Sequence, residues 1–393
     1  MKIEPRKQGI KLVSRMGDGI ENRIGMTVKN RLEVDDLKGE PEELQWYRVP
    51  LPEGRSGDGS SYHTYISRGT ENNLCIIISG GGVAWNEYTA ARPVTGGKVA
   101  AGLPNFYWNN LRPFTQLMNI NIGITNTKNS ANPFSKWHFV VVTYATGDFH
   151  IGNSEFSYKD ENGEDKILYF NGHSNFRLTM EVAKRLFPNP DRILVAGNSA
   201  GAFAVPALAP EIADDYYPNC SDITLLSDSG LLLFKDWKRT AKEIWKADSR
   251  FVDALHTDNP TVDWYEALYS EYGERFKYLY ASSTRDYLLS SYYNDIMTKQ
   301  YKTDADVQQV FYEQLKRMSE QLREITADFH FYIFNWQMLP LAVGKGGTVH
   351  TALKEISFAS RKSDDVTMAD WLYDQVNDDM YDIGMSLLEP ICS

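Results

Sequence analysis

Hydrophobic residues along the chain gather into short runs that are separated by Gly, Pro, Asn and Asp. Two of these runs, residues 137–144 (WHFVVVTY) and 192–196 (RILVA), are almost uninterrupted. Such runs are typical of strands that are buried on both faces of a parallel sheet. Between them, residues 174–186 carry hydrophobic side chains at helical spacing, and Pro188 follows. The order strand, helix, strand predicts a βαβ unit.

Other runs of similar composition extend this alternation. The further predicted strands are residues 46–51, 61–67, 74–79, 223–226, 276–281 and 329–336, and the further predicted helices are residues 200–216 and 367–376. We expect the first three of these strands to form antiparallel hairpins at one edge of the sheet. The whole pattern predicts an α/β fold with a mostly parallel central sheet flanked by helices.

Two helical insertions interrupt the alternation, at residues 231–272 and 287–328. Both are candidates for a lid over a functional site. Residues 1–45 are polar, show little periodicity and form a predicted N-terminal leader. Because no linker rich in Pro, Gly or Ser divides the chain, we expect a single domain over residues 1–393.

Composition and charge exclude several classes of protein. The 393 residues include 52 Asp and Glu against 41 Lys and Arg, which gives a formal net charge of −11. Proteins that bind nucleic-acid phosphates present a basic face, so we expect no nucleic-acid partner. No run reaches the roughly 18 consecutive apolar residues of a membrane span, so we expect none.

The three cysteines, Cys75, Cys220 and Cys392, form neither a disulfide framework nor a CxxC metal clip. We therefore expect no metal site. The N-terminus lacks the apolar core of a secretory signal. Together these features indicate a cytoplasmic protein, or a secreted one if the sequence begins after a cleaved signal.

The sharpest chemical signal is the string Gly197-Asn198-Ser199-Ala200-Gly201, which lies between a predicted strand and a helix of small residues. In that context a G-x-S-x-G string predicts a nucleophile elbow, in which the serine stands on a sharp turn. The amide of the next residue then points toward a developing oxyanion. A glycine-rich turn that binds phosphate, or a plain connection, remains an alternative.

Three glycines, Gly80, Gly81 and Gly82, directly follow predicted strand 74–79. Bare amides in such a loop can approach a substrate carbonyl oxygen, as in the glycine loop of esterases. We therefore expect Gly81, Gly82 and Ala200 to form an oxyanion hole. The alternative is a turn that needs a positive φ.

A general base would come from one of seven histidines. In the α/β-hydrolase order it follows the last strand, in a loop. His350 follows the glycine-rich residues 344–349 and fits this position. His330 lies inside predicted strand 329–336, where packing explains it, and His256 comes too early, within an insertion.

The acid that orients the base has two candidates. Asp286 follows predicted strand 276–281, the second strand after the elbow, which is the usual origin of the acid loop. Asp228 ends the strand before it and is followed by Ser229 and Gly230, a setting that also suits an aspartate capping its own turn. We favour Asp286, and Asp228 stays open.

Several strings form an ordered set along the chain. They are residues 56–60 (SGDGS), 80–86 (GGGVAWN), 132–134 (NPF), 144–152 (YATGDFHIG), 197–201 (GNSAG), 228–230 (DSG) and 350–351 (HT). Their order and spacing resemble the pectin acetylesterase family, which includes the Notum-like carboxylesterases. The resemblance implies an α/β-hydrolase fold and a triad of Ser199, Asp286 and His350.

The chain also departs from the family pattern. Where the family has cysteines, this sequence has Ser56, Ala84, Ala145 and Asn198. These substitutions are consistent with a reducing compartment and weigh against a secreted, cell-wall-directed role. On the family view, Asp148 and His150 are expected to shape a loop near the site rather than to react.

These observations predict a serine ester hydrolase without a cofactor, which removes O-acetyl or other short acyl groups from a small-molecule or glycan ester. Ser199 would form an acyl-enzyme, with His350 as base and Asp286 as its orienting acid. The alternatives are a non-catalytic binding or scaffold protein on a hydrolase fold, and a long-chain acyl esterase or serine peptidase. The sequence predicts no particular oligomeric state.

Overall fold

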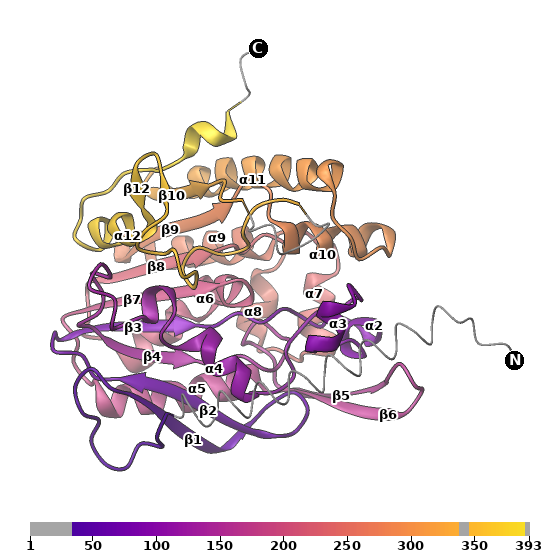
Figure 1. Cartoon of the computed structure of the whole chain (residues 1–393), viewed down its shortest axis with the longest axis horizontal. Coiled ribbons are helices and arrows are strands. Elements are labelled where there is room, and N and C mark those ends of the chain that lie inside the picture. Colours follow the sequence, from indigo (N-terminus) through magenta and orange to yellow (C-terminus); the bar gives the residue numbers. More distant parts are fainter. Residues whose placement is uncertain (1–33, 338–345, 390–393) are drawn as a thin grey trace, which may run out of the picture.

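A computed structural model describes residues 34–337 and 346–389, so most of the predicted leader lies outside the described residues. Its centre is an eight-stranded sheet in the order β1-β2-β4-β3-β7-β8-β9-β10 (Figure 1). The strands are β1 (Trp46–Arg55), β2 (Ser61–Ser67), β3 (Asn73–Ile78), β4 (His138–Val142), β7 (Arg192–Asn198), β8 (Ile223–Asp228), β9 (Phe276–Ser283) and β10 (Phe329–Phe334). From β4 to β10 all neighbours are parallel, whereas β1 and β2 are antiparallel. This confirms the predicted, mostly parallel sheet.

The position of β3 differs from the prediction. It lies inside the sheet, parallel to β4 and β7, so the expectation of an antiparallel edge hairpin is wrong for this strand. Leu74, Ile76 and Ile78 pack into the hydrophobic core on one face of the sheet, while Cys75 and Ile77 pack into the core on the other. An uninterrupted apolar run is what a strand covered on both faces requires.

Helices cover both faces of the sheet (Figure 1). The core on one face contains side chains of α5 (Gly172–Leu186), α6 (Ala200–Glu211), α9 (Pro260–Tyr272) and α11 (Ala305–Ile325), and the core on the other contains those of α12 (Met368–Val376). The side chain of Thr367 caps α12 by accepting a hydrogen bond from the amide of Asp370. No helix within the described residues combines the length and the apolar composition of a membrane span.

The remaining segments are shorter. They include α2 (Glu87–Ala90), α3 (Gly96–Ala100), α4 (Pro113–Asn119), η1 (Gly123–Thr125), η2 (Ile212–Tyr216), η4 (Gly273–Arg275), η5 (Met385–Leu388) and the two-residue strands β11 (Lys362–Ser363) and β12 (Val366–Thr367). A hairpin of β5 (Ser154–Lys159) and β6 (Asp165–Phe170), which the sequence did not predict, projects from the body of the molecule (Figure 1).

Both predicted insertions are helical. The first contains α7 (Trp237–Arg239), η3 (Thr240–Ile244), α8 (Ser249–Ala254) and α9, and the second contains α10 (Tyr287–Thr298) and α11. The first insertion's tryptophans at 237, 245 and 264 are buried in the core. The second lies beside the functional site, because α10 begins directly after Asp286.

Candidate active site

Ser199 stands on a sharp turn between β7 and α6. Its backbone has φ 54° and ψ −123°, a strained conformation for a residue with a side chain, and its amide donates a hydrogen bond to the carbonyl oxygen of Asp228 (2.8 Å). The flanking glycines permit this turn. A Cβ atom on Gly197 would collide with the carbonyl of Gly201, and one on Gly201 would collide with the carbonyl of Ile78. The turn therefore has the geometry of a nucleophile elbow.

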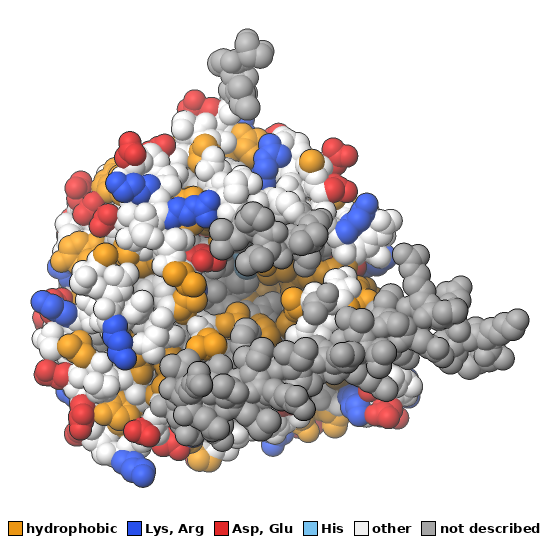
Figure 2. All heavy atoms as spheres, in the orientation of Figure 1, with side chains coloured by type: hydrophobic (Ala, Val, Ile, Leu, Met, Phe, Trp, Pro, Cys, Tyr) orange, Lys and Arg blue, Asp and Glu red, His pale blue; other side chains and the backbone are white. Residues whose placement is uncertain are grey.

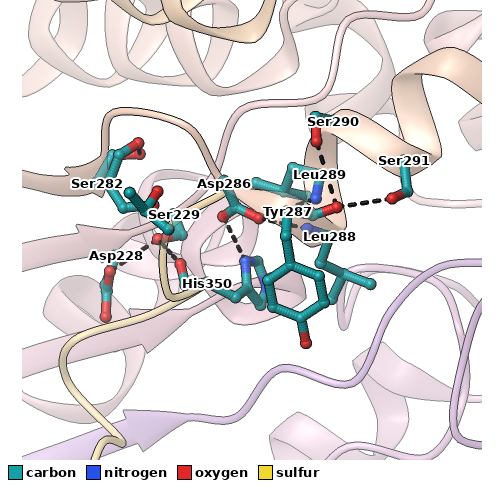
Figure 3. A network of polar contacts seen from close by, with 12 residues as sticks. Asp228, Ser229, Ser282, Asp286, Tyr287, Leu288, Leu289, Ser290, Ser291 and His350 are labelled. Carbon is teal, nitrogen blue, oxygen red and sulfur yellow. Dashed lines mark hydrogen bonds and ion pairs between the residues drawn. The ribbon is translucent and has the colours of Figure 1, made fainter. Parts of the chain in front are cut away.

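His350 and Asp286 form a direct pair. The Nδ1 atom of His350 lies 2.5 Å from Oδ2 of Asp286 (Figure 3). The other oxygen of Asp286 accepts hydrogen bonds from the amides of Leu288 and Leu289, which fixes the carboxylate at the start of α10. Burial alone would lower the pKa of His350, but the attraction and hydrogen bond of Asp286 raise it above its ordinary value.

His350 and Ser199 line the same cavity. This cavity has a volume of about 850 Å³ and is lined by Ser199, His350 and the three glycines at 80–82. The Nε2 atom of His350 is buried and has no hydrogen-bond partner among the described residues. No hydrogen bond joins it to Ser199 in this structure, but such bonds often shorten only when substrate binds.

The glycine loop packs directly against the elbow. A Cβ atom on Gly80 would collide with the Asn198 carbonyl and with Cβ of Ser199, and one on Gly81 would meet the ring of Tyr144. Gly82 has φ 81°, and a Cβ there would collide with the backbone of residue 106. Close packing thus requires glycine at all three positions, whereas a simple turn would not.

Three backbone amides of the glycine loop and the elbow are candidate donors. Gly81 and Gly82 line the cavity, and Ala200 directly follows Ser199. Within the part of the chain that the structure describes, the amides of these three residues have no hydrogen-bond acceptor. The amide of Gly80, by contrast, donates to the side chain of Asn198 (3.3 Å). This is the arrangement that an oxyanion hole needs, because free amides can bind a developing negative charge.

Asp228, the alternative acid, contacts a different part of the histidine segment. Its Oδ2 atom accepts hydrogen bonds from the amides of Ala352 (2.8 Å) and Leu353 (2.7 Å), and its Oδ1 lies 3.0 Å from the hydroxyl of Ser229. Burial raises its pKa to about 6, although these hydrogen bonds act in the opposite direction. The imidazole of His350 is paired with Asp286 and not with Asp228.

The other candidate histidines lie elsewhere. His330 is on β10, with Nδ1 3.4 Å from a carboxylate oxygen of Asp382. His256 is more than half exposed and lies beside Asp263 and Glu266. Neither lines the cavity that contains Ser199.

Asp148 and His150 lie behind the glycine loop. Asp148 accepts hydrogen bonds from the hydroxyl of Thr146 and from the amides of His150 and Gly172. Burial lowers the pKa of His150 to about 4, so its ring is neutral, and Nε2 donates to the carbonyl oxygen of Ser79 (2.8 Å). His150 thus holds Ser79, the residue that precedes Gly80, and Asp148 holds the backbone of His150.

A buried lysine in the cavity wall was not anticipated from the sequence. The Nζ atom of Lys354 donates to the carbonyl oxygens of Met118 (3.0 Å) and Asn119 (3.2 Å) and lies 3.4 Å from the hydroxyl of Ser79. Burial lowers its pKa to about 7. In the sequence, the only indication that this lysine lies near the site is its position four residues after His350. This lysine connects the histidine segment to the end of α4.

Exposed apolar side chains line part of the cavity. The face seen in Figure 2 is hollowed near its centre, with hydrophobic side chains around the hollow. Met118 and Ile356 line the cavity and are 43% and 84% exposed, respectively.

Within the described residues, no three His, Cys, Asp or Glu side chains gather as metal ligands would.

The parallel sheet and the strand–serine–helix turn define an α/β-hydrolase. A family model described as Pectinacetylesterase matches residues 55–288, more than half of the chain. The chain therefore belongs to the pectinacetylesterase family, whose members are carboxylic ester hydrolases.

A solved structure of similar fold is the Wnt deacylase Notum from Drosophila. The two share 13% sequence identity with a TM-score of 0.55, over 85% of this chain and 94% of that one. At this identity the likeness shows the fold alone. No curated protein sequence matches the chain.

Proposed function

We propose that this carboxylic ester hydrolase removes O-acetyl or other short acyl groups through a Ser199–His350–Asp286 triad. The observation that carries the proposal is the position of His350. Its Nδ1 atom pairs with Asp286, its Nε2 atom has no hydrogen-bond partner among the described residues, and His350 and Ser199 line the same cavity. This is the arrangement in which an imidazole acts as a general base toward a serine.

The chemistry follows from these positions. His350 accepts the proton of the Ser199 hydroxyl as Oγ attacks the ester carbonyl, and Asp286 holds the Nδ1–H tautomer and stabilises the imidazolium. His350 then gives the proton to the leaving alcohol. Water repeats the sequence on the acyl-enzyme and releases the acid.

The oxyanion of each tetrahedral intermediate needs donors that are already in place. The amides of Gly81, Gly82 and Ala200 meet this need, since they have no acceptor among the described residues. Losing one such donor reduces turnover by roughly 10²–10³-fold in other hydrolases.

Polar and aromatic residues support a carbohydrate as the alcohol part of the substrate. Asn105, Gln337, Ser357 and Arg361 line the cavity and can hydrogen-bond hydroxyl groups, and Trp108 offers an aromatic surface for a sugar ring. A cavity of about 850 Å³ is larger than an acetyl group needs. It has room for a sugar beside the acyl group.

The same volume favours a second candidate, a long-chain acyl esterase. Val94, Leu288, Tyr292 and Val349 give part of the cavity an apolar lining that would suit an alkyl chain. In this case the extra volume would hold the acyl chain rather than the alcohol.

A series of p-nitrophenyl esters with acyl chains of two to about sixteen carbons tests both candidates, with Ser199→Ala as control. We expect the highest kcat/KM for the shortest chains and loss of activity in the variant. A maximum at long chains would favour the second candidate. Equal activity in both proteins would contradict the triad, whereas no activity in either would favour a binding or scaffold protein.

A further inference from the structure

Asp228 is the residue in which the nucleophile turn and the histidine segment meet. It ends β8, where it pairs with Asn198 of β7 on one side and with Ala281 of β9 on the other. Its backbone carbonyl accepts the amide hydrogen of Ser199 (2.8 Å). The same residue therefore touches the nucleophile through its backbone and the histidine segment through its side chain.

The side-chain contacts are those of a clamp on residues 350–353. One carboxylate oxygen of Asp228 accepts the consecutive amides of Ala352 and Leu353. The hydroxyl of Ser229 lies 2.5 Å from the carbonyl oxygen of His350 and 3.0 Å from the other oxygen of Asp228 (Figure 3). All of these contacts are to the backbone of the segment, and none is to the imidazole.

The segment is held separately on the Asp286 side. The amide of Thr348 donates to the carbonyl of Arg285 (2.9 Å), and its hydroxyl donates to that of Ser283 (2.8 Å). These bonds align Thr348 with the strand end that carries Asp286. They fix the imidazole relative to its acid, but they do not fix it relative to Ser199.

We propose that Asp228 is a positioning residue, which sets the distance between Ser199 and the imidazole of His350 by clamping the backbone at residues 352 and 353. The proposal rests on the triad proposed above. Removing the carboxylate would leave the Asp286–His350 pair intact, but two buried amides would lose their acceptor and the segment would relax away from the elbow. A displacement of about 1 Å in such a geometry can cost on the order of 10² in rate.

The chain offers a closely matched control. Asp263 on α9 is also fully buried, one of its oxygens accepts the consecutive amides of His256 and Thr257, and its other oxygen accepts the hydroxyl of Thr257. The hydrogen-bonding chemistry is the same as at Asp228, but Asp263 does not line the cavity. A general effect of losing a buried carboxylate will therefore be seen in both variants.

The experiment compares Asp228→Ala, Asp228→Asn and Asp263→Ala with the unmodified chain. It measures kcat and KM for p-nitrophenyl acetate, the melting temperature, and hydrogen exchange of peptides that contain residues 350–354. We expect Asp228→Ala to lower kcat roughly 10²-fold with KM changed less than threefold, and to speed exchange in these peptides. Asp228→Asn, which keeps one acceptor oxygen, should recover about tenfold of that loss. Asp263→Ala should lower only the melting temperature.

Equal kcat in Asp228→Ala and Asp263→Ala would overturn the proposal, as would faster exchange at 350–354 without loss of kcat. If Asp228→Ala does not fold, the same measurements on Asp228→Asn and Ser229→Ala test the proposal. Wild-type kcat in both of these variants would overturn it. An unmodified chain that neither hydrolyses the ester nor reacts with a fluorophosphonate would instead refute the proposed function, and this inference with it.

Discussion

Asp228 and Asp286 stand at the ends of the neighbouring strands β8 and β9, and both are fully buried against the segment that carries His350. They bind it in different ways. Asp286 pairs with the imidazole, whereas Asp228 accepts backbone amides two and three residues further along. This difference shows that position alone does not determine the role of a buried aspartate at a strand end. The group that donates to it decides whether it orients a base or holds a loop.

The two carboxylates are also held in place by different elements of the fold. Asp286 is also the N-cap of α10, so its position is set in part by the start of this helix. Asp228 belongs to the sheet itself, and its backbone is hydrogen-bonded to the nucleophile turn. In the proposed triad, Asp286 therefore acts on the chemistry of the imidazole, and Asp228 acts on its location.

The largest effect that separates the two acids is expected from Asp286→Asn. Asparagine is also a good N-cap, so α10 should remain folded. The amide cannot stabilise the imidazolium and favours the wrong tautomer, which lowers kcat by about 10⁴-fold in a serine protease triad. Steady-state kinetics with p-nitrophenyl acetate and a thermal melt would measure both consequences.

Asp304→Asn is the matched control, because Asp304 caps α11 through the amide of Val307 and does not line the cavity. It should leave kcat unchanged. A decrease of 10⁴-fold in Asp228→Asn together with near-normal kcat in Asp286→Asn would show that the two roles are reversed.

The sequence predicts those features of the fold and the site that are encoded by residues close together in the chain. The turn at Ser199 was predicted because glycine spacing and the flanking strand and helix are encoded within a few residues. Asp286 is favoured over Asp228 by counting strands, and it is the carboxylate that contacts the imidazole of His350 in the structure. The mostly parallel sheet followed from uninterrupted apolar runs and is confirmed by the strand pairing.

Features that depend on distant contacts were not predicted. Asp228 meets Ala352 and Leu353 across more than 120 residues, and no local pattern encodes such a pair. The buried lysine at 354 donates to two carbonyl groups at the end of α4, more than 230 residues away in the sequence. The sequence groups β3 with two short edge strands of similar composition, although its buried apolar run is that of a central strand.

The pH dependence of kcat/KM should give a second, smaller difference between the acids. His350 must be neutral to act as a base, so activity should fall about tenfold per pH unit below its pKa. Burial lowers that pKa, while Asp286 and, to a smaller extent, Asp228 raise it. Neutralising either carboxylate therefore moves the acid limb to lower pH. We expect a larger shift in Asp286→Asn than in Asp228→Asn, in profiles of kcat/KM from pH 5 to 9. Equal shifts, or a shift to higher pH, would contradict the assigned contacts.

The smallest effect concerns stability and involves Asp228 alone. Burial raises the pKa of its carboxyl to about 6, above the value of about 4 expected in the unfolded chain. A raised pKa means that the folded state holds the proton more tightly, so the stabilising contribution is complete below pH 4 and is lost as the pH rises through 6. Asp228→Asn has no such proton. The free energy of unfolding of the unmodified chain, relative to this variant, should therefore fall by up to about 3 kcal/mol between pH 4 and pH 7. Urea denaturation across this range measures the difference. A difference that rises with pH would mean that the two amide hydrogen bonds outweigh the cost of burying the charge.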